Sequence, residues 1–288
     1  CCIVKHRKSC KLIIVDVFST NAFIYSALVI QLARIFKIRF HPVFRGGYLA
    51  EKYKKYPKIF HYLFQSPVVS ICPSMFFLEK FKHGPFYMKL IPNYISLEEY
   101  PYKKRQQFYP KVLWVRSIHP IYNPEMAIDV IAQLNQDHPQ VKLCMVGPVK
   151  DKALFDKLQE KIRVLQLEDC IQFTGQLSKN KWSAIARDYD IFINTSNIDN
   201  TPVSIMEAMA LGLPIVSTNV GGIPYLIDDG VTGLLINSSD SDQMAEKINE
   251  LISGKIDGDF ITRNARQRIS IMDKKEIIKK LYDIIDDA

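Results

Sequence analysis

Two acidic residues that could bind a ligand, Asp199 and Glu207, stand with seven residues between them in the stretch 194–222. Carboxylate oxygens accept hydrogen bonds, so this pair suits a ligand that carries hydroxyl groups, such as a sugar or a ribose. The alternative is that Asp199 is a solvated turn residue and that Glu207 faces water. Residue types alone leave both interpretations open.

The same stretch predicts a helix over residues 203–211. Thr201 can cap this helix, and Pro202 suits its first position. The first N–H groups of a helix lack acceptors and lie at the positive end of its dipole. The N–H groups of Val203 and Ser204 therefore predict an anion-binding site beside the two carboxylates.

The whole stretch resembles the donor-site signature of retaining glycosyltransferases of family 4, which have the GT-B fold. That signature consists of two acidic residues separated by seven others, an Ala-Met-Ala-x-Gly-x-Pro run, a strand and Gly-Gly. The matching residues are Asp199, Glu207, Ala208, Met209, Ala210, Gly212, Pro214, Gly221 and Gly222. Asp199 is a departure, because Glu is commoner there and reaches one methylene further.

The resemblance implies an α/β GT-B fold, in which two Rossmann-like domains face a cleft. The first domain would bind the acceptor, and the second would bind a nucleotide-diphosphate sugar. Glu207 would hold the ribose hydroxyls, Asp199 would orient the donor sugar, and both are catalytic candidates together with Arg116. The distal phosphate would be bound by the residues at the helix start, which are Thr201, Pro202, Val203 and Ser204.

Arg116 follows the first predicted strand of the second domain. In the family an Arg there, with a Lys a few residues later, neutralises the donor diphosphate as its charge grows. Here no Lys or Arg follows until Lys142, and His119 or Tyr122 could hydrogen-bond a phosphate instead. The alternative for Arg116 is an ion pair on the domain face.

By the same resemblance, the backbone of Leu177 would contact the nucleobase.

Arg45, Gly46 and Gly47 end a predicted strand in the first part of the chain, and strand ends line ligand clefts in parallel sheets. Many family members have a His at the position of Arg45 that touches the donor sugar, so these three residues are donor-binding candidates. The family also begins with a strand and a Gly-rich loop. No such segment precedes Cys1, so we expect a truncated N-terminal domain.

Strand and helix patterns alternate along the chain and predict parallel sheets with helices on both faces. The expected strands are 11–18, 38–44, 68–72, 90–94, 112–115, 141–146, 171–174, 191–194, 215–218 and 233–236. The expected helices are 21–36, 51–64, 75–82, 124–137, 152–165, 181–188, 203–211, 223–227, 241–252, 260–270 and 274–285. We expect a partial acceptor-side domain at 1–100, a linker at 101–110, a nucleotide-sugar-binding domain at 111–270, and a C-terminal helix at 271–288 that crosses back to the first domain.

The charge of the chain is uneven. Residues 1–100 contain 15 Lys and Arg against 5 Asp and Glu, the remainder contains 23 against 25, and the net charge is +8. A basic first part suits an anionic membrane face or a phosphate-bearing acceptor; a merely solvated basic surface is the alternative. No recognition motif points to nucleic acid, which is not an expected partner.

The six cysteines are scattered and form no CxxC pair. This spacing is not that of a disulfide framework or a zinc ribbon, and it favours the reduced thiols of a cytoplasmic protein. Cys1, Cys2, His6 and Cys10 have ligand chemistry, but without a second cluster we predict no metal site. No apolar stretch predicts a membrane span; the expected location is cytoplasmic, with peripheral contact at the inner face of a membrane.

Together these features predict a hexosyl-type transferase that needs no metal or other cofactor. It would move a sugar, with retention, from a nucleotide-diphosphate sugar to a hydroxyl of a glycan or lipid-linked acceptor, in surface polysaccharide or glycolipid synthesis. Two alternatives stay open. One is a non-catalytic nucleotide-sugar-binding remnant or partner subunit, and the other is a GT-B sugar-nucleotide epimerase.

Overall fold

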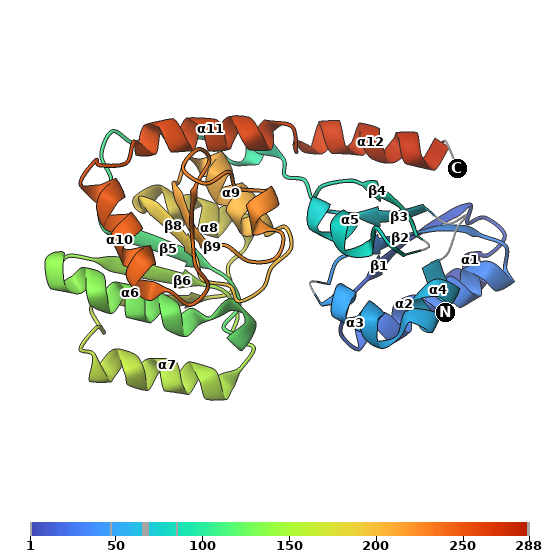
Figure 1. The fold of residues 1–288 in the computed structure, drawn as a ribbon, viewed down its shortest axis with the longest axis horizontal. Helices are drawn as coiled ribbons and strands as arrows, with labels where there is room; N and C mark the ends of the chain where they lie inside the picture. The colour runs from blue at the N-terminus through green and yellow to red at the C-terminus, as the bar shows by residue number, and fades with distance from the viewer. Residues whose placement is uncertain (1, 47, 65–68, 85, 287–288) are drawn as a thin grey trace. The chain divides into compact units, whose positions relative to one another are not determined.

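The computed structural model describes residues 2–46, 48–64, 69–84 and 86–286. The chain divides into a first unit, Cys1–Asn93 with Asp283–Ala288, and a second unit, Tyr94–Tyr282. Each unit contains its own parallel sheet with helices packed against it (Figure 1). The predicted α/β class with two Rossmann-like domains is confirmed, while the domain boundaries and the crossing of the last helix stay predictions.

The first unit is built on a four-stranded parallel sheet in the order β1-β2-β3-β4. Its strands are β1 (Leu12–Val17), β2 (Arg39–Phe44), β3 (Val69–Cys72) and β4 (Tyr87–Leu90). Its helices are α1 (Cys2–His6), α2 (Ala22–Ile35), α3 (Leu49–Lys55), α4 (Pro57–Phe64) and α5 (Met75–Phe81). Aromatic rings fill much of the core, including those of Phe23, Phe44, Phe60, Phe64, Phe77 and Phe81.

Two predictions for the first unit were wrong in detail. The expected helix 51–64 is two helices, α3 and α4, because a proline disfavours helical geometry in the residue before it. Tyr56, which precedes Pro57, has φ −132° and ψ 55°. The last strand is β4, not 90–94: after Leu90 only the Ile91 N–H still bonds to β3, and Pro92 has no N–H to continue the ladder.

The second unit is built on a six-stranded parallel sheet in the order β10-β9-β8-β5-β6-β7. The strands are β5 (Lys111–Val115), β6 (Lys142–Val146), β7 (Ile171–Gly175), β8 (Ile191–Asn194), β9 (Ile215–Thr218) and β10 (Leu234–Ile236). The first strand along the chain, β5, lies between β6 and β8, so the strand order reverses there. Such a reversal opens a crevice at the carboxyl ends of the strands, where ligands bind in doubly wound sheets.

Helices pack on both faces of the second sheet. One face carries α6 (Pro124–Asp137), α7 (Lys152–Val164) and α10 (Ser241–Ile252), and the other carries α8 (Lys179–Ile185), α9 (Val203–Leu211) and α11 (Gly258–Ser270). Single turns of 3-10 helix are η1 (Leu97–Glu99), η2 (Pro120–Tyr122), η3 (Ala186–Asp188) and η4 (Ile223–Tyr225). The last helix is α12 (Lys274–Asp286).

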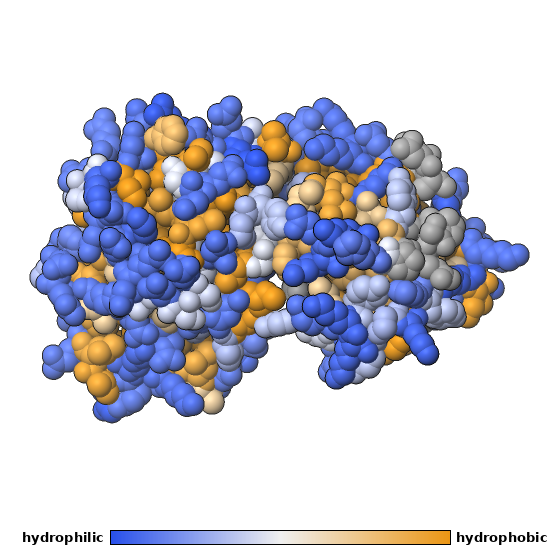
Figure 2. All heavy atoms as spheres, in the orientation of Figure 1, coloured by the Kyte–Doolittle hydropathy of each residue, from blue (hydrophilic) through white to orange (hydrophobic). Residues whose placement is uncertain are grey.

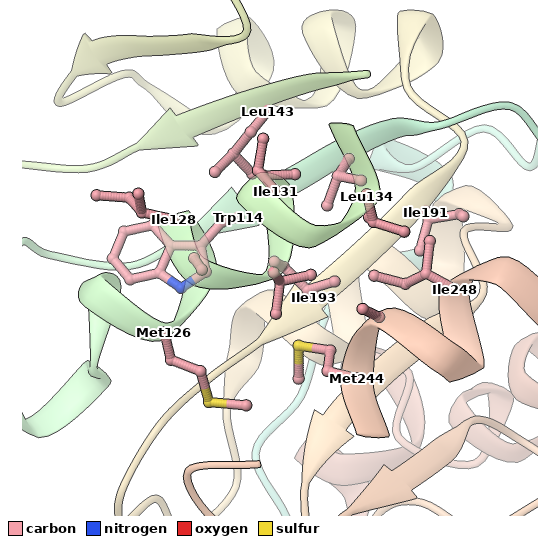
Figure 3. Packing of buried hydrophobic residues seen from close by; sticks show 14 of the residues in the cluster. Trp114, Met126, Ile128, Ile131, Leu134, Leu143, Ile191, Ile193, Met244 and Ile248 are labelled. Atoms are coloured by element: carbon pink, nitrogen blue, oxygen red, sulfur yellow. The ribbon is translucent and has the colours of Figure 1, made fainter. Parts of the chain in front are cut away.

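Residues of the second sheet alternate between two cores, because successive side chains of a strand point to opposite faces. In β5, Val112 and Trp114 belong to the core under α6 and α10, whereas Leu113 belongs to the core under α9 and α11. Figure 3 shows the first of these cores, where Trp114 and Ile193 of the sheet face side chains of α6 and α10. Burial of each large side chain contributes roughly 1.5–3 kcal/mol to folding.

The surface is mainly polar on the face shown in Figure 2, with apolar residues scattered between hydrophilic ones. Within the described ranges, no helix is both long enough and apolar enough to span a membrane.

Candidate functional site

Two predicted catalytic residues, Arg116 and Asp199, meet at the strand-order reversal of the second sheet. Arg116 directly follows β5, and Asp199 lies in the loop after the neighbouring strand β8. Arg116 Nη2 donates to Asp199 Oδ2 at 2.6 Å, and the two side chains are only 15% and 16% exposed. The guanidinium also lies 5.2 Å from the ring centre of Tyr122, a cation–π contact. Arg116 is therefore fixed at the strand end by a carboxylate and a ring.

The loop that carries Asp199 is held tightly by its own backbone. The Asn200 N–H donates to Asp199 Oδ1 at 2.8 Å, so both carboxylate oxygens are engaged. The Gly222 N–H donates to the Asp199 carbonyl at 2.9 Å. At Gly221, where φ is +57°, an added Cβ would lie 1.9 Å from that carbonyl oxygen. The Gly-Gly pair is thus required by a close approach of two loops.

A similar close approach fixes Arg116 from the β6 side. The Arg116 N–H donates to the Val146 carbonyl at 3.0 Å. A Cβ on Gly147, where φ is +151°, would lie 1.9 Å from the Arg116 carbonyl oxygen. The Gly147 N–H donates in turn to the Gly175 carbonyl at 2.9 Å. The ends of three neighbouring strands are therefore tied together beneath the site.

Buried polar side chains after β8 complete this frame. Trp114 Nε1 donates to Thr195 Oγ1 at 3.0 Å, and the Thr195 hydroxyl donates to the Tyr122 carbonyl at 2.8 Å. The Thr218 hydroxyl donates to the Ser196 carbonyl at 2.7 Å. Satisfied buried networks of this kind rigidify the backbone that they hold. The strand ends therefore form a stiff support for the Arg116 pair.

The start of α9 provides donors for an anion, although its cap differs from the prediction. The N-cap residue is Pro202 rather than Thr201, with ψ 114° and no side-chain capping bond; proline has no side-chain acceptor to supply one. Across the described residues, the N–H groups of Val203 and Ser204 have no acceptor, and Ser204 Oγ and Arg116 Nε are buried without a partner. The start of α9 therefore offers hydrogen-bond donors that suit a bound anion.

Glu207 lies one turn into α9 and is only 4% exposed, so the alternative in which it faces water is wrong. Its Oε1 accepts a hydrogen bond from the Tyr100 hydroxyl at 2.5 Å and lies 3.5 Å from Lys179 Nζ. Burial raises the pKa of Glu207, while the Tyr100 hydrogen bond and the charges of Lys179 and Arg116 act to lower it. A buried carboxylate beside two cations is suited to bind ligand hydroxyls.

The sequence did not point to Tyr100 or Lys179 as partners of Glu207. Tyr100 precedes β5 and is 2% exposed, whereas Lys179 begins α8 and its side chain is 65% exposed. No local pattern marks either residue, because each reaches Glu207 from an element far away along the chain. In the sequence, only the polar side chains of these two residues could have marked them as partners of a carboxylate.

Residues 101–110, predicted as a linker, contribute to the second unit. Arg105 is 5% exposed, and its Nε lies 3.2 Å from Asp190 Oδ1. Its Nη1 donates to the Gly212 carbonyl at 2.7 Å, and its Nη2 donates to the Tyr189 carbonyl at 2.8 Å. Gly212 is the left-handed C-cap of α9, where a cation is favourable. The segment thus fixes the far end of the helix that carries Glu207.

The remaining donor-site candidates lie in the first unit. Arg45 follows β2, and it donates from Nε to Asp16 Oδ1 at 2.9 Å and from Nη1 to Asn93 Oδ1 at 2.6 Å. A Cβ on Gly46 would lie 2.4 Å from the Ser19 backbone nitrogen, so this glycine also serves a close approach. Gly47 lies outside the described residues.

Other predicted contacts are placed in the second unit. Leu177 follows β7, is half-buried and packs against the core beside α9. His119 is exposed, and its Nδ1 accepts a hydrogen bond from the Ile121 N–H at 3.2 Å at the start of η2. Tyr122 contacts Arg116 through its ring. Each of these assignments to donor binding stays a prediction.

A metal site is not formed by the side chains that the structure describes: none of their His, Cys, Asp and Glu residues gather in a group of three or more suited to hold an ion. That the reaction needs no metal stays a prediction.

Two curated relatives are similar to part of the chain. It is 35% identical over 124 residues to a putative colanic acid biosynthesis glycosyltransferase, WcaL, of Salmonella typhimurium, covering 40% of this chain and 30% of the relative. It is 31% identical over 127 residues to the amylovoran biosynthesis glycosyltransferase AmsK of Erwinia amylovora, covering 42% and 31%. The chain spans about a third of the length of these relatives.

Solved structures share the fold of nearly the whole chain. One is Anabaena Alr3699/HepE in complex with UDP and glucose, with a TM-score of 0.81 and 19% identity over 99% of this chain and 81% of that chain. Another is sucrose-phosphate synthase from Thermosynechococcus elongatus, with a TM-score of 0.83 and 18% identity over 99% and 75%. At this identity the likeness shows the fold, which is that of the GT-B glycosyltransferases.

The family described as glycosyl transferases group 1 matches residues 101–268, which is more than half of the chain. The match contains Arg116, Asp199, Glu207 and the whole of α9. The chain therefore belongs to the glycosyl transferases of group 1.

Proposed function

We propose that this chain is a retaining, hexosyl-type glycosyltransferase of family 4 that takes its sugar from a nucleotide diphosphate. One arrangement carries the proposal. The buried Arg116–Asp199 pair lies at the strand-order reversal of the second sheet, and α9 brings unsatisfied donors and the buried carboxylate of Glu207 to the same loops. A nucleotide diphosphate has phosphates for the donors and ribose hydroxyls for the carboxylate.

Each group then has a distinct role. Glu207 accepts hydrogen bonds from the ribose hydroxyls. Arg116 and the N–H groups of Val203 and Ser204, with Thr201 beside them, stabilise the negative charge that grows on the leaving diphosphate. Fixed cations and helix dipoles can do this without a metal, which is why we propose a metal-independent reaction.

Asp199 orients the donor indirectly, through Arg116. Its Oδ2 accepts from Arg116 and its Oδ1 accepts from the Asn200 N–H, so neither oxygen is left as a good nucleophile. This engagement favours a route without a covalent sugar–enzyme intermediate. Retention would then require the acceptor hydroxyl to attack on the face from which the diphosphate departs, as the resemblance to family 4 implies.

The proposed substrates follow from the relatives and from the charge of the first unit. A structural neighbour binds UDP-glucose, so a UDP-sugar is the first donor to test. The curated relatives serve colanic acid and amylovoran biosynthesis, which suggests a growing surface glycan or a lipid-linked acceptor. The basic residues of 1–100 would suit peripheral contact with an anionic membrane face, and we propose a cytoplasmic location.

Calorimetric titration of the purified chain with UDP, GDP and dTDP tests the donor site, first with chelator and then with magnesium. We expect one nucleotide to bind without metal. Replacement of Glu207 by Ala should weaken that binding by roughly 1–3 kcal/mol, because the ribose hydroxyls lose a charged acceptor. Unchanged nucleotide affinity in this variant would contradict the assignment of Glu207 to the ribose hydroxyls.

The matched control is Glu250→Ala. Glu250 is also a nearly buried glutamate with two cationic partners, Lys247 and Lys255, but it lies on α10, on the opposite face of the sheet from α9. Its removal should leave nucleotide affinity unchanged. Nucleotide-sugar binding with neither transfer nor slow donor hydrolysis would instead favour a non-catalytic binding protein, and isomerisation of the donor without acceptor would favour an epimerase.

A further inference from the structure

We propose that Tyr100 is a positioning residue, which holds the Glu207 carboxylate so that its second oxygen meets the ribose hydroxyls of the donor. This inference rests on the proposed function, because it assigns a supporting partner to the carboxylate that binds the nucleotide. It is carried by the contact between two buried side chains that lie 107 residues apart.

The contact is short and sheltered from water. The Tyr100 hydroxyl donates to Glu207 Oε1 at 2.5 Å, and the two residues are 2% and 4% exposed. A hydrogen bond from a neutral donor to a carboxylate is stronger than one between neutral groups, and its loss in a buried site leaves a charge with fewer partners. The position of the hydroxyl therefore controls the position of the carboxylate.

Tyr100 is itself held against the helix that carries Glu207. Arg266 Nη1 donates to the Tyr100 carbonyl at 3.0 Å and to the Ala210 carbonyl of α9 at 2.6 Å. The Tyr100 ring also packs with Trp182, with the ring centres 6.5 Å apart. Backbone and ring are thus anchored to elements around α9, so the hydroxyl cannot move freely relative to Glu207.

The two partners of Glu207 leave one of its oxygens for a ligand. Tyr100 and Lys179 both approach Oε1, and no residue in the described part of the chain donates a hydrogen bond to Oε2. A carboxylate can accept about four hydrogen bonds. Oε2 therefore has the capacity to accept from ribose hydroxyls while Oε1 stays anchored.

The charge state of Glu207 gives this arrangement a measurable signature. Burial raises the pKa of Glu207, and the Tyr100 hydrogen bond opposes that rise, as do the charges of Lys179 and Arg116. Burial and the hydrogen bond to Glu207 raise the pKa of Tyr100, and the charge of Glu99 adds to that rise. Without the hydroxyl, the pKa of Glu207 should rise further, and the carboxylate should become protonated at a higher pH.

Tyr100→Phe tests the inference, because it keeps the ring and removes only the hydroxyl. We expect the affinity for UDP at neutral pH to fall roughly 3- to 10-fold, as for the loss of one hydrogen bond. We also expect the pH at which affinity is lost on acidification to move upward. Packing alone would not shift that midpoint, so an unchanged midpoint together with unchanged affinity overturns the proposal.

A second measurement does not depend on nucleotide binding. Titration of the Glu207 side-chain carboxyl by carbon-13 NMR, assigned with Glu207→Gln, should show a higher pKa in Tyr100→Phe than in the wild-type chain. Equal values would overturn the positioning role even if nucleotide binds. If the wild-type chain binds no nucleotide, the proposed function fails, while this titration still decides whether Tyr100 acts on Glu207.

Tyr102→Phe is the matched control. Tyr102 lies two residues after Tyr100 in the chain. Its hydroxyl contacts Thr262 Oγ1 of α11 at 3.1 Å. Its removal should change neither the affinity for UDP nor the pKa of Glu207. An effect equal to that of Tyr100→Phe would show that the loss of any tyrosine hydroxyl in this segment disturbs the site, and would overturn the specific role of Tyr100.

Discussion

Each unit of the molecule pairs an arginine at the end of a strand with an aspartate, but the surroundings of the two pairs differ. Arg45 and Asp16 in the first unit lie 2.9 Å apart with side chains 37% and 52% exposed. Arg116 and Asp199 in the second unit lie 2.6 Å apart and are 15% and 16% exposed. Exposed pairs contribute about 0–1 kcal/mol to stability because water screens them. In a buried pair the electrostatic interaction between the two charges is much stronger.

The difference comes from the backbone around each pair. The second pair rests on strand ends that are tied together by Gly147, by Gly221 and by the buried Thr195 network. Arg45 has an amide partner in Asn93, but its carboxylate partner is half in solvent. The same two residue types therefore form a rigid site only where the strand ends exclude water.

Arg116→Ala should have the largest effect of the variants that test the difference between the two pairs. The leaving diphosphate would lose its fixed cation, so we expect kcat/KM for sugar transfer to fall about 10²- to 10³-fold. Arg45→Ala is the paired variant. Its kcat/KM should fall by less than about tenfold, because the exposed charge of Arg45 is screened. Steady-state kinetics with a UDP-sugar compare the two; equal losses would show that the first-unit pair acts on the donor as strongly.

Gly221→Ala should disturb the loop that carries Asp199 while leaving the charge of Arg116 in place. A Cβ would lie 1.9 Å from the Asp199 carbonyl oxygen in a backbone with φ +57°, so the loop must shift. We expect the free energy of unfolding to fall by roughly 2–4 kcal/mol, as for overpacking combined with backbone strain. Urea denaturation followed by circular dichroism measures this.

Gly230→Ala is the control for that variant. Gly230 also has a positive φ of +72°, but no atom lies within 4 Å of the added Cβ. Only the backbone strain remains, so the free energy of unfolding should fall by about 1 kcal/mol. If both alanines destabilise equally, conformational strain rather than the close approach to Asp199 explains the glycine.

The smallest effect should come from two glutamates with opposite pKa shifts. Burial raises the pKa of Glu207, so the folded chain favours its protonated form and loses stability as pH rises through that pKa. Ion pairs with Lys247 and Lys255 lower the pKa of Glu250, so its contribution is present at neutral pH and is lost on acidification.

Thermal melts at pH 8 and pH 4 should separate these two cases. Glu207→Gln should raise Tm by about 1–3 °C at pH 8, because the buried charge is gone, and should leave Tm nearly unchanged at pH 4. Glu250→Gln should lower Tm at pH 8 and change it less at pH 4. A lower Tm for Glu207→Gln at pH 8 would mean that its partners more than offset the cost of burying the carboxylate.

Local sequence patterns predicted most elements of the second unit. The bounds of β8, β9, α6, α9 and α10 agree with the expected ranges, because each has a clear apolar run or helical periodicity and a distinct start and end signal. The first unit was predicted less well where a proline changed the local geometry, as at Pro57. The spacing of Asp199 and Glu207 placed the candidate site on α9 because that motif is confined to one continuous stretch.

Local sequence was thus enough to predict the βα alternation, the α9 segment and the residue types available for chemistry, since these depend on neighbours within one or two turns. The folded chain was needed to show that Asp199 pairs with Arg116, that Tyr100 and Lys179 reach Glu207, and that Gly221 lets two loops touch. The contacts of Glu207 depend on how α8 and the segment before β5 pack against α9, and the Arg116–Asp199 contact depends on strand order. Because β5 lies between β6 and β8, residues far apart along the chain meet at adjacent strand ends, and no local periodicity records that meeting.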